Sequence, residues 1–354
     1  MDSKNNDNFS EMELLQEIRK KIENIRNCKI TLIGDIMLDR YVFGYANNLN
    51  STAPVPVLKE THRVQSVGAA AHAARGAQSL GLTPFLHGII GDDEAGLEVE
   101  KSLENEGVSA NNLVMVEGRK TTIKTRMIAS RESLIRNKQL LLRWDEEDKE
   151  SVPSDVTIAM MDNCIQSLSE SKALIISDYG KGVLDDELVK GLLSKCKELG
   201  IPSICDPKLT GLHRTKGADA ILFQSRGMDI MTKRLELPDR ESAANRLLEE
   251  YGWGSLFVIG GDQGVTLYQS GKTFEHYPCT LTTPLQQIGM LDAAAVALAA
   301  GLTMEMSLSE CAIIVNAACE CILLAEDSSN FALTQRALAT RLDETAWKLQ
   351  ISQR

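Results

Sequence analysis

The chain has 354 residues, which is enough for one large or two ordinary domains with a sizeable core. Hydrophobic residues make up 43% and charged residues 25%, as in ordinary globular proteins. A net charge of −11 argues against non-specific binding to nucleic acid or to an anionic membrane, but it does not exclude a small anionic ligand.

The eight cysteines are scattered along the chain. Only Cys319 and Cys321 stand close together, and they lack the second pair that a zinc site would need. We interpret the cysteines as buried, reduced thiols of a cytoplasmic protein. The N-terminus does not resemble a signal peptide, and the longest apolar run, 293–302, is too short to cross a bilayer.

The first part of the chain predicts a helix and then a buried strand. Residues 1–8 are polar and are expected to be disordered, whereas apolar residues at helical spacing predict an amphipathic helix over 10–25. The strand 29–33 runs into Gly34 and Asp35, at the kind of strand end where open α/β sheets bind ligands. Together with Asp39, Asp35 favours a polyol-binding role; the alternative is that both are turn residues without a ligand.

Residues 41–58 differ in character from the strand before them. Aromatic residues alternate over 41–45, and the segment 53–57 contains two prolines, which predict an edge or lid strand. Small residues from Gly68 onward then begin a helix, where a ligand or another backbone can approach closely. His72 is either a contact to that ligand or, as is commoner for a lone histidine, a partly buried side chain satisfied by the protein.

The remaining chain alternates between strands and helices. Residues 121–128 predict a strand with Lys124 and Arg126 on one face, where they either meet an anion or are solvated. From residue 152, apolar strands alternate with helices, which predicts a doubly wound, mainly parallel α/β sheet with helices on both faces. Polar residues or glycines follow the ends of these strands: Asp178, Lys181, Asp206, Lys208, Ser225, Gly261 and Gly264.

The segment 284–301 combines a turn at Gly289, an acid at Asp292 and an alanine-rich helix. The start of a helix presents unpaired N–H groups that can hold phosphate oxygens, and a carboxylate there can accept a proton from a hydroxyl. These residues are consistent with a phosphoryl-transfer centre. The alternative is a buried helix that carries Asp in its first turn, where this residue is favoured.

The order of these motifs resembles that of the ribokinase-like (phosphofructokinase-B type) carbohydrate kinases, and among them the heptose-7-phosphate kinases of ADP-heptose synthesis. The resemblance covers most of residues 29–302. It is carried by GDIMLDRY at 34–41, APVPV at 53–57, GDDEAG at 91–96, TTIKTR at 121–126, RNKQL at 136–140, SDYGKGV at 177–183 and DPK at 206–208.

The resemblance implies a kinase domain over 29–330, with a small β lid from about 41–58 and 120–143. Residues 1–28 would form an N-terminal extension and 331–354 a C-terminal helix. The family transfers the γ-phosphate of ATP, bound with Mg²⁺, to a sugar hydroxyl, and often dimerises through the lid. Asp292 matches the catalytic base. The implied sugar-phosphate contacts are Asp35, Asp39, Gly68, His72, Lys124, Arg126, Asp178, Lys181, Asp206 and Lys208; the implied nucleotide contacts are Ser225, Gly261, Gly264, Gly289 and Asn316; no metal ligand is assigned.

Several positions depart from the family pattern. The Gly-Ala-Gly-Asp turn is here GMLD at 289–292, so Leu291 replaces a glycine whose backbone approaches the phosphate, in a conformation that a Cβ forbids. The Asn-x-x-Glu that organises Mg²⁺ falls on SRGM at 225–228, and Met228 cannot bind a hard cation. Further departures are Ile259 for a threonine, Glu320 for a small glycine near the adenine region, His72 for an asparagine, and NNLNST at 47–52 for a segment that contains Arg and Glu.

Two functions follow from this mixture. In the first, the chain is a pseudokinase that binds a sugar phosphate, a nucleotide or a partner chain. It acts as a regulatory or assembly subunit, either as a homodimer through the lid or with an active kinase. In the second, it is an active ATP-dependent sugar-phosphate kinase with an unusual site. The joint loss of the anion-binding glycine and the Mg²⁺-organising pair favours the first, because removal of one preorganised donor alone costs roughly 10²–10³ in rate.

Overall fold

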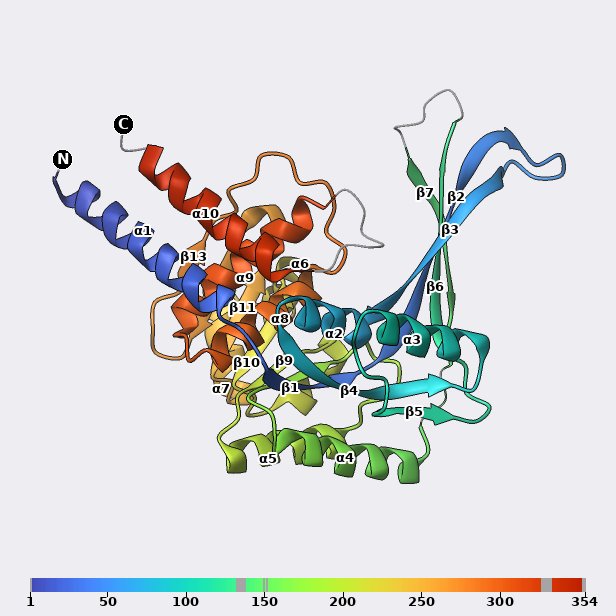
Figure 1. Ribbon diagram of the computed structural model, residues 1–354, viewed down its shortest axis with the longest axis horizontal. Helices are drawn as coiled ribbons and strands as arrows, with labels where there is room; N and C mark the ends of the chain where they lie inside the picture. The colour runs from blue at the N-terminus through green and yellow to red at the C-terminus, as the bar shows by residue number, and fades with distance from the viewer. Residues whose placement is uncertain (1, 132–137, 149, 151, 326–332, 352–354) are drawn as a thin grey trace.

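The computed structural model describes residues 2–131, 138–148, 150, 152–325 and 333–351. Within these residues a nine-stranded sheet forms the centre of the molecule (Figure 1). Its strands are β1 (Cys28–Gly34), β4 (Leu82–Gly91), β5 (Leu113–Val116), β8 (Leu174–Ser177), β9 (Ser203–Asp206), β10 (Ala220–Gln224), β11 (Ser255–Ile259), β12 (Val265–Gln269) and β13 (Glu275–Tyr277).

The order of these strands is β13-β12-β11-β10-β9-β8-β1-β4-β5. Neighbours from β5 to β11 pair in parallel, and only β12 and β13 pair antiparallel, at one edge. The predicted mainly parallel sheet is therefore confirmed. The helices are α1 (Asp2–Glu23), α2 (Ala70–Ser79), α3 (Glu94–Asn105), α4 (Ser154–Leu168), α5 (Asp186–Leu199), α6 (Ser225–Arg234), α7 (Arg240–Tyr251), α8 (Met290–Thr303), α9 (Leu308–Leu323) and α10 (Gln335–Ile351), with short 3₁₀ turns η1 (Leu209–Thr215) and η2 (Gly261–Gln263).

The sheet separates two hydrophobic cores. Successive strand residues point to opposite faces. Leu32 therefore belongs to the core that also contains residues of α1, α2, α3, α8, α9 and α10, whereas Ile33 belongs to the core that contains residues of α4, α5, α6 and α7. Ile175 and Ile176 of β8 divide in the same way. The strands are buried on both faces, which explains why they read as continuous apolar runs in the sequence.

The lid is a separate four-stranded sheet that projects from the α/β body (Figure 1). Its strands are β2 (Ile36–Leu49), β3 (Pro56–Ala69), β6 (Thr122–Ser130) and β7 (Gln139–Glu146), in the order β3-β2-β6-β7. Pro56 begins an edge strand, as its lack of an N–H predicts. The lid extends further than the predicted 41–58, and residues 132–137 of the predicted 120–143 lie outside the described residues.

The two terminal helices lie side by side (Figure 1). The Gln335 side chain at the start of α10 donates to the carbonyl oxygens of Ile22 and Ile25, at and beyond the end of α1. The expectation of disorder before residue 9 is wrong for residues 2–8, because α1 continues to Asp2. Among the described residues, no helix is both long and apolar enough to cross a membrane.

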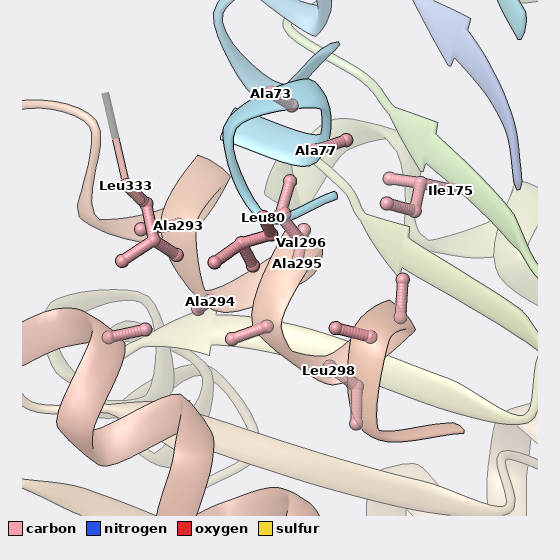
Figure 2. Close-up of a cluster of buried hydrophobic side chains, with 14 of the residues drawn as sticks. Ala73, Ala77, Leu80, Ile175, Ala293, Ala294, Ala295, Val296, Leu298 and Leu333 are labelled. Carbon is pink, nitrogen blue, oxygen red and sulfur yellow. The ribbon is translucent and has the colours of Figure 1, made fainter. Parts of the chain in front are cut away.

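Helix α8 is held firmly against α2 and the central strands. Figure 2 shows alanines of α8, with Val296 and Leu298, beside Ala73 and Ala77 of α2 and near Ile175. Small side chains let the two helices approach closely, and α8 is buried along nearly its whole length. The position of its N-terminus, which carries Asp292, is therefore fixed by packing.

Candidate functional site

Two pockets meet at the carboxyl edge of the main sheet. The larger, of about 360 Å³, lies beside the ends of β9 and β10 and the starts of α6 and α8. The smaller, of about 150 Å³, lies between the lid strands and α2. Tyr179, Ile288, Gly289 and Asp292 line both pockets. Ligands in the two pockets would therefore meet at Asp292, which is the geometry that group transfer between them requires.

Asp292 is buried and bonded on both carboxylate oxygens. His72 Nδ1 lies 2.9 Å from its Oδ2, and the Tyr179 hydroxyl donates to its Oδ1 at 3.3 Å. Burial lowers the pKa of His72, but the hydrogen bond and the charge of Asp292 outweigh burial and raise this pKa above its ordinary value. Burial raises the pKa of Tyr179, so its phenol stays protonated and can donate. Asp292 is thus bonded to both His72 and Tyr179, and its charge favours the protonated form of His72.

The turn before α8 depends on Gly289. This residue has φ of +82°, and a Cβ on it would lie 2.6 Å from Cε1 of His72. The expectation that a glycine conformation is also required at 291 is wrong, because Met290 and Leu291 are ordinary helical residues of α8. Met290 is buried in the core, while Leu291 is half-buried and both line the larger pocket. Leu291 takes a helical conformation because α8 begins at Met290, directly after Gly289.

The smaller pocket carries charges from the lid. Arg126 is paired with Asp39, with both side chains largely buried, and its guanidinium lies 5.2 Å from the Tyr41 ring centre. Lys124 lies over the Tyr179 ring at 5.3 Å, and burial lowers the pKa of its ammonium group. Gly68 is needed because a Cβ there would lie 2.3 Å from Asp39 Oδ2. The pocket can therefore bind the hydroxyl groups of a ligand through its carboxylate and the anionic group of a ligand through its cations.

The larger pocket carries carboxylates and cations together. Asp178 accepts from the Gly180 N–H at 2.8 Å and from Arg214 Nη1 at 3.0 Å. Lys208 lies over the Tyr179 ring, with its Nζ 4.7 Å from the ring centre. Burial, and next the nearby Asp292 charge, raise the pKa of Asp206 to about 8. Further lining residues are Gln224, Arg226 and Gln287.

The raised pKa of Asp206 predicts a specific pH dependence of stability. The folded protein keeps a proton on Asp206 up to about pH 8, whereas the unfolded chain releases it near 3.8, so stability falls as pH rises through this window. Asp206→Asn is expected to raise the melting temperature at about pH 9 and to have little effect near pH 4. Thermal unfolding at several pH values checks this, with exposed Asp262→Asn as the control. A pH-independent difference would contradict the prediction.

Ala69 is strained at the edge of the smaller pocket. Its φ of 54° with ψ of −130° is rare for a residue with a Cβ, and it joins β3 to α2. Ala69→Gly is expected to stabilise the fold by about 1–2 kcal/mol, because glycine adopts this conformation freely. Urea unfolding measures the change. The helical control Ala73→Gly should instead cost about 1 kcal/mol, and a similar loss for Ala69→Gly would show that there is no strain.

Not every predicted site residue lines these pockets. Asp35 is buried and accepts hydrogen bonds from the Tyr179 and Lys181 N–H groups at 2.7 and 3.2 Å. It therefore holds the backbone of the 177–183 segment in position. Burial raises its pKa to about 6. Lys181 is paired with Glu147. The predicted nucleotide residues that line neither pocket are Ser225, Gly261, Gly264 and Asn316.

Some lining residues were not predicted from the sequence. Tyr179 stands within the SDYGKGV segment, and its position two residues after the end of β8 was the available signal. Gln287 comes from the segment before Gly289, and Arg214, which bonds to the lining residue Asp178, comes from η1, which carries no motif. Neither had a pattern in the sequence that could have identified it.

The residues around the larger pocket do not fit Mg²⁺. Met228 is fully buried in the apolar core, and the Ser225 hydroxyl donates to the Ile259 carbonyl at 3.3 Å. Of the carboxylates on the wall, Asp178 and Asp292 are each bonded to a basic side chain. Magnesium prefers one or two free carboxylates together with phosphate oxygens and water. The remaining carboxylate, Asp206, shares the wall with two cations, Lys208 and Arg226.

Comparison with known proteins places the chain in a family. Residues 27–335 match the pfkB family carbohydrate kinases. The chain is 30% identical over 293 residues to the bifunctional protein HldE of Actinobacillus pleuropneumoniae serotype 5b, which covers 82% of this chain and 59% of that protein. It is 29% identical over 306 residues to the bifunctional protein HldE of Paramagnetospirillum magneticum, which covers 86% and 61% respectively. The chain thus spans about three fifths of the length of these relatives.

Solved structures share the fold at low identity. Escherichia coli phosphofructokinase-2 in complex with fructose-6-phosphate aligns with a TM-score of 0.67 at 16% identity, covering 90% of this chain and 99% of that one. Arabidopsis thaliana ribokinase complexed with ribose and ATP aligns with a TM-score of 0.66 at 14% identity, with the same coverage. The ribokinase-like fold predicted from the sequence is confirmed. The chain belongs to the pfkB family of carbohydrate kinases.

Proposed function

We propose that this chain binds a sugar phosphate such as heptose 7-phosphate in the smaller pocket and transfers phosphate to it poorly or not at all. It would act as a regulatory or assembly subunit. The contact between His72 and Asp292 carries the proposal. A carboxylate that acts as a general base must accept the proton of the acceptor hydroxyl, and here His72 and Tyr179 already contact both oxygens of Asp292.

The larger pocket, which would hold the phosphates of ATP as the phosphate donor, supports the same conclusion. The larger pocket does not fit the Mg²⁺ that phosphoryl transfer from ATP uses to neutralise charge. Glu320, at the position where the resemblance implies a small glycine near adenine, is buried and paired with Arg341. ATP would therefore lose contacts at both of its ends.

Sugar-phosphate binding rests on the charges and hydroxyl partners of the smaller pocket. Calorimetry with heptose 7-phosphate is expected to detect binding to the wild-type chain, and Arg126→Ala is expected to weaken it by roughly tenfold or more, since a charged hydrogen bond is lost. Arg63→Ala, on exposed β3, is the matched control. No binding by the wild type, or equal binding by Arg126→Ala, would contradict this part of the proposal.

An active kinase is the second candidate. The observation that favours it is Asp292 itself, which lies at the junction of both pockets in the first turn of α8. ADP formation that depends on Asp292 separates the two candidates. A third candidate is an enzyme that acts on a different sugar or nucleotide, and a thermal-shift panel of sugar phosphates and nucleotides would identify that ligand.

The lid supports a homodimer as the proposed assembly. Edge strand β7 exposes Leu140, Leu142 and Trp144, and the last two lie on one face because the strand pairs regularly over 142–146. Exposed apolar strand edges are sites of association. Sedimentation tests the dimer: the wild type is expected to be dimeric and Leu142→Lys monomeric. A monomeric wild type would contradict the homodimer, and a complex with an active kinase would then be tested.

A further inference from the structure

The larger pocket presents two cations that no ion pair neutralises. Lys208 follows β9, and Arg226 stands in the first turn of α6. Both side chains are exposed, and within the described parts of the chain neither forms an ion pair with a carboxylate. Their charge is therefore available to a ligand in the pocket that they line.

Two helix starts add backbone donors to the same pocket. Helix α6 begins after Gln224 and α8 after Gly289, and neither helix has a side-chain cap. The first N–H groups of an uncapped helix lack partners and carry the positive end of the helix dipole. Residues from the first turns of both helices line the pocket, so these donors and the two cations surround one space.

The acids on the wall cancel little of this charge. Asp178 is bonded to Arg214, and Asp292 to His72. Burial raises the pKa of Asp206 to about 8, so this side chain is largely protonated at pH 7. At neutral pH the groups left to meet a ligand are mainly Lys208, Arg226 and the backbone donors.

We propose that the larger pocket binds a phosphate-bearing anion through Lys208 and Arg226, without a divalent cation. The guanidinium of Arg226 can bond two phosphate oxygens, and the ammonium of Lys208 supplies a point charge. A volume of about 360 Å³ suits a short run of phosphates, whether free or at the end of a nucleotide. This proposal rests on the proposed function, because it names the ligand of the larger, phosphate-donor pocket in the absence of Mg²⁺.

Calorimetry on the whole chain tests the proposal with sodium tripolyphosphate, in EDTA and in excess Mg²⁺. Binding in EDTA is expected, with no higher affinity in Mg²⁺, and Arg226→Ala should weaken it roughly tenfold or more. Arg234→Ala, in the last turn of the same helix, is the matched control and should bind as the wild type does. A second series with ATP shows whether free polyphosphate or a nucleotide is the tighter ligand.

Three outcomes would overturn the proposal: no binding in EDTA, binding that requires Mg²⁺, or equal binding by Arg226→Ala and wild type. Circular dichroism of each variant confirms folding, and Arg226→Lys, which keeps the charge, should restore part of the affinity. The result is independent of phosphoryl transfer. Metal-free binding together with Asp292-dependent transfer would contradict the proposed function alone, and Mg²⁺-dependent binding without transfer would contradict this inference alone.

Discussion

Arg341→Ala is expected to destabilise the fold by about 3–5 kcal/mol, because it leaves the buried carboxylate of Glu320 without its cation. The two side chains are only 5% and 2% exposed. Glu320 also accepts from the Thr280 N–H, and Arg341 donates to the Thr280 hydroxyl. Urea unfolding followed by circular dichroism gives the change in the free energy of unfolding.

Glu344→Gln is the matched control for this prediction. Glu344 also pairs with Arg341, but its side chain is 52% exposed, so its loss should cost less than about 1 kcal/mol. If Arg341→Ala costs no more than the control, the buried pair does not anchor α10. The expected large cost would show that α10 is part of the kinase fold, since Arg341 joins it to α9 and to the segment that leads to Gly289.

Gly34→Ala is expected to cost about 3 kcal/mol or more, or to prevent folding. Gly34 pairs with Ser177 between the central strands β1 and β8, and a Cβ would lie 2.2 Å from the Ser177 carbonyl oxygen. Both partners are backbone, so neither can move without separating the strands. The shift would also displace Asp35, whose N–H bonds to the same carbonyl.

The control for Gly34→Ala is Gly76→Ala. Gly76 lies within α2, and its Cβ would make only an ordinary contact, 3.7 Å from Val296. Alanine favours a helix over glycine, so this substitution should be neutral or stabilising by up to about 1 kcal/mol. Soluble yield and urea unfolding compare the two variants. A Gly34→Ala protein as stable as the control would show that the strands can separate at little cost.

Most of the fold could be predicted because its signals are local. Continuous apolar runs identified the parallel strands, and Pro56 identified an edge strand of the lid. The polar residues at strand ends, such as Asp178 and Asp206, converge at one sheet edge because parallel strands end on the same side. The antiparallel pairing of β12 and β13 carried no comparable signal, since short strands pair according to the loops that join them.

The site was harder to predict because its key contacts join distant residues. His72 and Asp292 are 220 positions apart. No periodicity in the sequence relates α2, which carries His72, to the first turn of α8, which carries Asp292. From the sequence, His72 was either a contact to the ligand or a partly buried histidine bonded within the protein. The structure shows it bonded to Asp292. The family pattern implied a backbone conformation at 291 that suits only glycine, but Leu291 is helical there, because the start of α8 depends on how the helix packs.

We expect the His72–Asp292 contact and the altered phosphate-donor pocket to leave little or no phosphoryl transfer. The most direct test incubates the purified chain with ATP, Mg²⁺ and heptose 7-phosphate and measures ADP against Asp292→Asn. We expect the wild type to form ADP no faster than Asp292→Asn, while calorimetry on the same preparation still detects the sugar phosphate. Clear turnover by the wild type that Asp292→Asn abolishes would contradict the account and identify an active kinase.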